Sequence, residues 1–195
     1  MKNPIKTPKL IVAISGASGA VYGVSALQAL KRAEVESHLI VSKAASLSLN
    51  AELDMSLADL HNLADVVYKP ADIGATIASG SFRTLGMLIA PCSIKTLGEI
   101  ATGVTTTLIS RAADVCLKER RRLVLMVRES PLHLGHLRSM AAVTEMGAIV
   151  APPMPAFYTR PQSLEEMVDQ SVGRALDLFG IETDIKRWGG LGGDE

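Results

Sequence analysis

The stretch at residues 10–33, LIVAISGASGAVYGVSALQALKRA, decides the fold. It opens with a short apolar run rich in β-branched side chains, which is typical of a buried strand. The segment SGASGA at 15–20 then breaks that run with small residues and two glycines. Apolar side chains recur at helical spacing through 21–33. The stretch therefore predicts a strand, a glycine turn and a helix, which is the repeating unit of an α/β sheet.

Further short apolar runs alternate with helical segments along the chain. Strands that are apolar at every position are buried on both faces, as in parallel sheets covered by helices on both sides. We therefore expect one domain over residues 1–188, an α/β fold with a doubly wound parallel sheet, and a disordered tail at 189–195. The later strands are expected at 38–41, 66–68, 87–90 (ended by Pro91), 123–127 and 149–151, and the later helices at 44–49, 57–64, 94–102, 108–120, 131–147 and 163–180.

The composition excludes several classes of protein. The chain has 195 residues, 48% of them hydrophobic and 21% charged, which is enough for a substantial core. Its 20 basic residues balance 20 acidic ones, so no long-range positive field exists to hold a nucleic acid. No apolar run approaches the roughly 20 residues that cross a bilayer, and the N-terminal segment lacks a signal-peptide core. We therefore expect a cytoplasmic protein with no membrane span and no nucleic-acid partner.

Neither the cysteines nor the histidines have the spacing of a metal site. Cys92 and Cys116 do not form a CxxC pair, so we expect two reduced, buried thiols. His133 and His136 are spaced i, i+3, but zinc sites use three or more protein ligands and no suitable third residue is near in sequence. We therefore expect no metal.

Small, hydroxyl-bearing and cationic residues follow the expected strands. Because ligands of doubly wound sheets bind outside the carboxyl ends of the strands, these residues are expected to surround one site. Small residues let the backbone approach a ligand, and serine-capped helix N-termini direct N–H groups towards an anion. Any single turn could need Gly and Ser for capping alone, but their coincidence at five strand ends favours a phosphorylated ligand. They are Gly16, Ser18 and Gly19, then Ser42, then Cys92, Ser93 and Lys95, then Arg128, Glu129 and Ser130, and last Tyr158.

The first turn argues for a mononucleotide over a dinucleotide. It reads G-x-x-G from Gly16 to Gly19, whereas nicotinamide dinucleotide sites carry G-x-G-x-x-G. In such dinucleotide sites an acidic residue about 20 positions further on holds the ribose. Residues 38–42 of this chain contain no Asp or Glu. FMN needs one phosphate cradle and no such acid, so FMN fits better than NAD.

The chain resembles the UbiX/Pad1 flavin prenyltransferases along nearly its whole length, to about Trp188. One matching word would be weak support, but the ordered series is highly specific to this family. The matching stretches are SGASGA at 15–20, SKAA at 42–45, ASGS at 78–81, PCSIKTL at 91–97, RAAD at 111–114, LKERR at 117–121, VRE at 127–129 and FYTRPQS at 157–163.

This resemblance implies a flavodoxin-like or Rossmann-like fold and a metal-independent transferase. Such enzymes join a dimethylallyl group from dimethylallyl phosphate to reduced FMN, giving prenylated FMN for a UbiD-type decarboxylase, and they form homododecamers with sites shared between subunits. By the same resemblance, Glu52 is the acid/base and Ser18 the flavin-side hydroxyl. The implied FMN-binding residues are Gly16, Ala17, Ser18, Ser42, Ser93, Ile94, Lys95, Thr96 and Arg128, and the implied prenyl-phosphate residues are Lys118, Arg128, Tyr158 and Arg174.

Two other functions remain open at the level of sequence. A related flavoprotein that decarboxylates a thiol compound would usually carry a catalytic His on the helix after the first turn, and residues 21–33 contain none. A carrier that only binds FMN would leave the cations Lys118 and Arg174 without a role. The chain also has no Trp between Pro70 and Phe82, unlike some members of the family it resembles.

Overall fold

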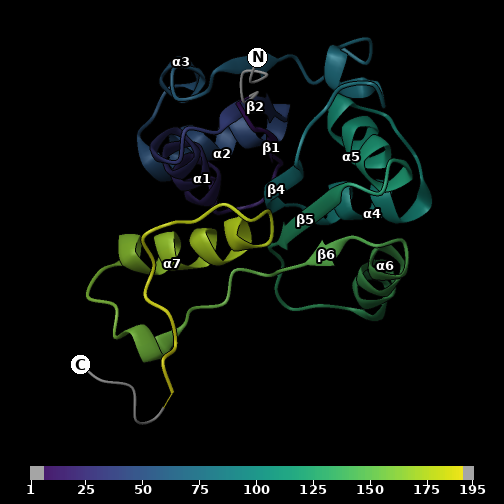
Figure 1. Ribbon diagram of the computed structural model, residues 1–195. Coiled ribbons are helices and arrows are strands. Elements are labelled where there is room, and N and C mark those ends of the chain that lie inside the picture. The colour runs from purple at the N-terminus through teal and green to yellow at the C-terminus, as the bar shows by residue number, and fades with distance from the viewer. Residues whose placement is uncertain (1–6, 191–195) are drawn as a thin grey trace, which may run out of the picture.

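Six parallel strands form one sheet in the computed structural model, which describes residues 7–190 (Figure 1). Their order, β3-β2-β1-β4-β5-β6, is that of Rossmann-type sheets, whereas flavodoxin-type sheets run 2-1-3-4-5. The order reverses between β1 and β4, which places the ligand crevice there. The expected doubly wound sheet is therefore confirmed. The strands are β1 (Lys9–Ile14), β2 (Glu36–Val41), β3 (Val66–Tyr68), β4 (Gly86–Cys92), β5 (Arg122–Val127) and β6 (Ile149–Val150).

Helices cover both faces of this sheet. One face packs against α1, α2 and α7, and the other against α4, α5 and α6 (Figure 1). Alternate residues of β1 enter the two cores, Leu10 and Val12 on one side and Ile11 and Ala13 on the other. The helices are α1 (Ala20–Arg32), α2 (Lys43–Leu53), α3 (Leu57–His61), α4 (Ile94–Thr102), α5 (Leu108–Lys118), α6 (Leu134–Glu145) and α7 (Leu164–Asp177), with 3-10 turns η1 (Thr76–Ala78) and η2 (Phe157–Thr159).

The prediction that Pro91 ends its strand is wrong, because β4 continues to Cys92. Proline lacks an N–H donor, but its carbonyl remains free to accept. The Pro91 carbonyl accepts from Ser15 N at 3.2 Å, and the Cys92 carbonyl accepts from Arg128 N at 3.1 Å. Backbone hydrogen bonds to these carbonyls therefore continue the strand pairing past Pro91.

Several helix boundaries also differ from those expected. The helix expected to begin at Pro131 starts at Leu134, because His133 is its N-cap and accepts from Gly135 N at 3.0 Å. The last helix ends at Asp177, short of Gly180. Of the tail expected at 189–195, residues 191–195 lie outside the described part of the chain. Across residues 7–190, the longest apolar helical stretches fall short of what a membrane span requires.

Candidate functional site

Two hollows adjoin at the carboxyl end of the sheet, where β1 and β4 part. The turn after β1 lies between them, since Gly16 lines one hollow and Ser18 and Gly19 line the other. We call the first the Gly16 hollow, with a volume of about 680 Å³, and the second the Glu52 hollow, with about 750 Å³. The site is thus built on the turn that the sequence singled out.

Three helices begin at the Gly16 hollow. Their N-caps are Ser42 for α2, Ser93 for α4 and Thr107 for α5, and all three line it. Each cap side chain accepts from a backbone N–H of the first turn, from Ala45, Thr96 and Ser110 respectively. Because helix N-termini carry partial positive charge, their convergence favours an anion such as phosphate.

Close backbone approach explains the two glycines of the turn. A Cβ on Gly16 would lie 2.4 Å from the Cβ of Ala44 in α2, closer than packed carbons allow. Gly19 has φ +106°, in the left-handed region, and a Cβ there would lie 2.9 Å from the Tyr22 ring. Side chains at either position would force the turn away from its neighbours.

Glu52 bonds the N-terminus of α1. Its Oε2 accepts from Gly19 N at 2.8 Å and from Ala20 N at 3.1 Å. Burial favours the neutral acid, but these N–H groups, the Ser18 hydroxyl and the charge of Arg128 outweigh burial and hold the pKa of Glu52 below its ordinary value. The carboxylate is therefore ionised at neutral pH and available as a proton acceptor.

Arg128 and Tyr22 complete the polar side of the Glu52 hollow. Arg128 directly follows β5, and its backbone N–H bonds the end of β4, which fixes its place at the crevice. Burial raises the pKa of Tyr22 despite the nearby Arg128 charge, so its phenol stays neutral. Much of the remaining wall is apolar, including Leu53, Leu164 and Met167.

The structure brings most of the expected residues to these hollows. Ala17 lies in the turn between them, and Ile94 opens α4 and packs against the core beneath the Gly16 hollow. Gly16, Ser42, Ser93, Lys95 and Thr96 line the Gly16 hollow, and Ser18, Glu52 and Arg128 line the Glu52 hollow.

Lys118, Tyr158 and Arg174 line neither hollow of the described chain. Lys118 ends α5, about 15 Å along the helix from its start at the Gly16 hollow, and pairs with Glu119 at 2.6 Å. Arg174 lies on α7, about one helical turn beyond Ser171, which lines the Glu52 hollow, and it pairs with Asp177. Tyr158 packs edge-on against Trp188. Within residues 7–190, these three residues therefore do not meet in either hollow.

Sequence reasoning missed Tyr22, Thr107 and Pro70 as lining residues. For Thr107 a signal existed, since T-x-x-S before the helix at 108 is a capping pattern, and Thr107 and Ser110 cap each other. Pro70 arrives from the end of β3, and nothing local to its sequence indicates the hollow.

In the described part of the chain, Cys92, Cys116, His133 and His136 do not form a metal site. Burial raises the pKa of both Cys92 and Cys116 to about 12, as expected for inert packing thiols. The rings of His133 and His136 lie 3.5 Å apart, centroid to centroid. Within residues 7–190, no group of three or more His, Cys, Asp or Glu side chains is placed to hold a metal ion.

Comparison with known proteins matches the chain to one family. The Flavoprotein family model matches residues 1–175. The flavin prenyltransferase UbiX of Escherichia coli K12 is 56% identical over 186 residues, covering 93% of this chain and 98% of that protein.

Solved structures agree with the sequence match. A crystal structure of AnUbiX (PadA1) with FMN and dimethylallyl pyrophosphate has TM-score 0.94 and 49% identity, covering 95% of this chain and all of that one. A dodecameric FMN-dependent UbiX-like decarboxylase from Escherichia coli O157:H7 has TM-score 0.91 and 49% identity, covering 93% of this chain and all of that one. With sequence, fold and crevice in agreement, the chain belongs to the Flavoprotein family and, within it, to the UbiX/PAD1 flavin prenyltransferases.

Proposed function

We propose that this protein transfers the dimethylallyl group of dimethylallyl phosphate to reduced FMN, producing prenylated FMN. The observation that carries the proposal is the pairing of two hollows across one turn. The Gly16 hollow offers helix N-termini to a phosphate, and the Glu52 hollow offers a carboxylate, an arginine and apolar walls. A flavin and an allylic phosphate need these two environments side by side.

The residues of the Gly16 hollow fit the FMN phosphate. First-turn N–H groups of α2, α4 and α5 are directed to one place, and Gly16 lets the backbone come close. The hydroxyls of Ser42 and Thr96 add further donors, and Ser93 orients Thr96 by donating to its Oγ1 at 3.1 Å. Lys95 is largely exposed and pairs with Glu99 at 3.1 Å, so its charge lies at the rim. Reduced FMN, when bound here, supplies the electron-rich ring that accepts the prenyl group.

Arg128 and Glu52 have complementary roles in the proposed reaction. Breaking the allylic C–O bond leaves negative charge on the departing phosphate, which a fixed guanidinium stabilises as the charge develops. The flavin must later release a proton. Since the lowered pKa of Glu52 keeps it ionised, this carboxylate accepts a proton more readily than it donates one. The Ser18 hydroxyl forms a hydrogen bond with Glu52 and supplies the hydroxyl on the side that faces the flavin.

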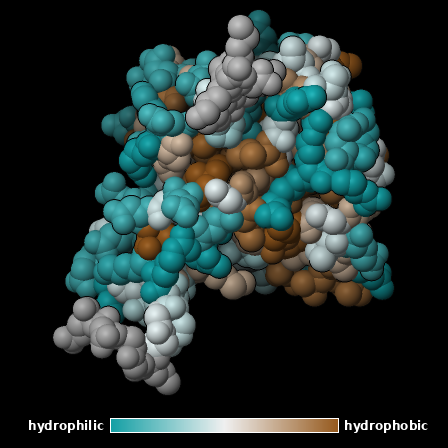
Figure 2. Space-filling model, in the orientation of Figure 1, coloured by the Kyte–Doolittle hydropathy of each residue, from teal (hydrophilic) through white to brown (hydrophobic). Residues whose placement is uncertain are grey.

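Lys118, Tyr158 and Arg174 grip the prenyl phosphate from neighbouring copies of the chain. Two observations support this: the three residues line neither hollow of their own chain, and a relative of 49% identity is dodecameric. Exposed apolar side chains gather on and beside α6, and Figure 2 shows a hydrophobic area towards the position of α6 and β6. The exposed apolar side chains at α6 are Leu132, Leu134, Leu137 and Met146. Monomers rarely expose large apolar patches, so a homododecamer accounts for them.

The product, prenylated FMN, is proposed to pass to a UbiD-type decarboxylase. The direct assay mixes the protein with reduced FMN and dimethylallyl phosphate without oxygen and measures the mass of the flavin. A gain of one prenyl unit is expected. Tight binding of unchanged flavin would instead support an FMN carrier. In a parallel assay with a thiol compound, release of carbon dioxide would support a decarboxylase.

A further inference from the structure

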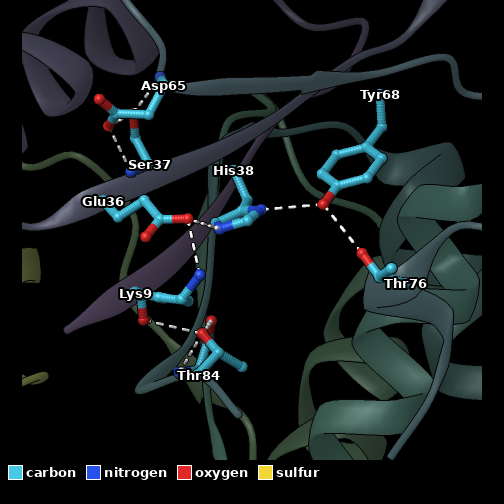
Figure 3. Close-up of polar contacts among 9 residues, drawn as sticks. Lys9, Glu36, Ser37, His38, Asp65, Tyr68, Thr76 and Thr84 are labelled. Atoms are coloured by element: carbon cyan, nitrogen blue, oxygen red, sulfur yellow. Dashed lines mark hydrogen bonds and ion pairs between the residues drawn. The ribbon is translucent and has the colours of Figure 1, made fainter. Parts of the chain in front are cut away.

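A chain of hydrogen-bonded side chains links Glu36 and the buried His38 to Thr76, which is exposed (Figure 3). At its centre, His38 of β2 is only 2% exposed. Its Nε2 lies 3.0 Å from Glu36 Oε1, and its Nδ1 lies 3.0 Å from the Tyr68 hydroxyl at the end of β3. The Tyr68 hydroxyl lies 3.0 Å from Thr76 Oγ1 in η1. The chain thus joins two sheet strands to the segment that follows them.

The direction of every bond in this chain is fixed. Lys9 Nζ lies 2.7 Å from Glu36 Oε1, and its hydrogen bond lowers the pKa of Glu36 and keeps that carboxylate ionised. A carboxylate only accepts, so His38 carries its proton on Nε2. Burial lowers the pKa of His38, leaving the ring neutral and Nδ1 an acceptor. Tyr68 therefore donates to His38, and Thr76 donates to Tyr68.

The bond from Thr76 to Tyr68 closes the loop at residues 69–75. This loop has no strand or helix, and Ile73 within it is 63% exposed. Its internal bonds are short-range backbone contacts, such as Asp72 N to Lys69 O at 3.0 Å, and Leu108 N to Pro70 O at 2.8 Å ties it to α5. Segments with few buried contacts open at little cost in free energy. The Tyr68–Thr76 bond is therefore well placed to set how often the loop opens.

The loop forms one wall of the Gly16 hollow. Pro70 and Ala71 line that hollow directly. The Pro70 carbonyl also accepts from Leu108 N at 2.8 Å, next to the N-cap Thr107 of α5, which lines the hollow too. An open loop would thus displace both an apolar wall and the start of a helix that faces the phosphate.

Residues 80–82, which follow Thr76 in the chain, are held by contacts that do not involve the Tyr68–Thr76 bond. The Phe82 ring packs edge-on to His38 at 4.9 Å between centroids, and Arg121 donates to the carbonyls of Gly80 and Phe82 at 2.5 Å. Residues 80–82 therefore stay in place when the Tyr68–Thr76 bond is cut. The effect of cutting it is confined to the loop.

We propose that His38, Tyr68 and Thr76 are positioning residues for FMN: their hydrogen-bond chain holds the 69–75 loop closed and so fixes the Pro70 wall of the Gly16 hollow. This inference rests on the proposed binding of FMN in that hollow. None of the three side chains lines the hollow, so they act through the loop.

The test compares two substitutions at one position. Thr76→Val keeps the shape and removes the donor, whereas Thr76→Ser keeps the donor. FMN affinity, measured by flavin fluorescence, should fall about three- to tenfold in Thr76→Val, the usual worth of a hydrogen bond, and stay within about twofold in Thr76→Ser. Tyr68→Phe should match Thr76→Val, and combining the two should add little, since both cut the same bond.

Thr84→Val is the control, because Thr84 bonds the Lys9 carbonyl at 2.9 Å in the same region and does not touch the loop. It should leave FMN affinity unchanged, and KM for dimethylallyl phosphate at saturating FMN should be unchanged in all variants. In ligand-free protein, amide hydrogen exchange at residues 69–75 should be faster in Thr76→Val than in the wild type. In Thr76→Ser it should match the wild type.

Three results would overturn the inference: wild-type FMN affinity in Thr76→Val, equal losses in Thr76→Val and Thr76→Ser, or unchanged exchange at 69–75. A wild-type protein that binds no FMN would overturn the proposed function itself, which separates the two failures.

Discussion

The two hollows and the three outlying residues differ in how the fold brings them together. Gly16, Ser42 and Glu52 follow strands or lie on the helices that come next, and a parallel sheet gathers such positions at one edge. Lys118 lies at the far end of α5 and Arg174 about one turn of α7 beyond the lining residue Ser171, and neither lines a hollow of its own chain. Topology alone therefore gathers the proposed flavin-binding residues, whereas the proposed phosphate grip requires residues of a second chain.

The largest expected effect comes from Glu52→Gln, at the strand-end half of the site. The amide keeps the shape and an acceptor for the α1 N–H groups but cannot take up a proton. Turnover should fall about 10²-fold or more, the usual scale for a general base, while FMN affinity stays near that of the wild type. Steady-state kinetics together with flavin titration check this, and near-normal turnover would remove Glu52 from the mechanism.

Gly16→Ala tests the close approach at the turn. Its Cβ would lie 2.4 Å from the Cβ of Ala44, so the turn or α2 must shift. Overpacking of this kind costs about 1–3 kcal/mol, and FMN affinity should fall about tenfold or more. Gly98→Ala is the matched control, because a Cβ there meets nothing within 4 Å. Equal FMN affinity in the two variants would contradict the assigned role of the turn.

Arg174→Ala tests the outlying half. KM for dimethylallyl phosphate should rise about tenfold, the order expected for a lost charged hydrogen bond, with FMN affinity little changed. Arg187→Ala is the control, since Arg187 bonds the same Asp177 at 2.8 Å and is not assigned to the substrate. If both variants raise KM equally, the effect comes from Asp177 and the helix end instead of the substrate.

The smallest expected effect concerns stability in acid. The folded-state pKa of Glu52 is lowered, so its ionised form stabilises the fold above the unfolded pKa, and that contribution is lost as pH falls through the folded value. Thermal unfolding of the wild type should therefore approach that of Glu52→Gln below about pH 4, near the ordinary range of a glutamate. Parallel curves from pH 7 down to pH 3 would show that the α1 contacts do not stabilise the ionised form.

The strands and the rim were predictable because both follow local rules. The apolar runs at 10–14 and 123–127 can only be buried, and whatever follows a parallel strand reaches the ligand edge. The continuation of β4 through Pro91 was not predictable, since its carbonyl finds partners only once β1 and β5 lie on either side.

The positions of Pro70 and Glu52 in the walls of the hollows also depend on tertiary packing. Pro70 reaches the Gly16 hollow because β3 pairs with β2 and the next loop folds over towards α5. Glu52 meets the N-terminus of α1 only because α2 is long enough to carry it there. Neither contact can be predicted from the residues nearby in the sequence.

Mixed oligomers test the central claim most directly. Glu52→Gln and Lys118→Ala chains, each with little activity alone, are co-assembled, and prenylated FMN is measured. If Lys118 serves a neighbour's hollow, some sites combine an intact Glu52 with an intact Lys118, and part of the activity returns. Mixing Glu52→Gln with Arg128→Ala should restore none, because both residues line one chain's hollow. No recovery in the first mixture, with mixed oligomers verified by mass, would contradict the shared site.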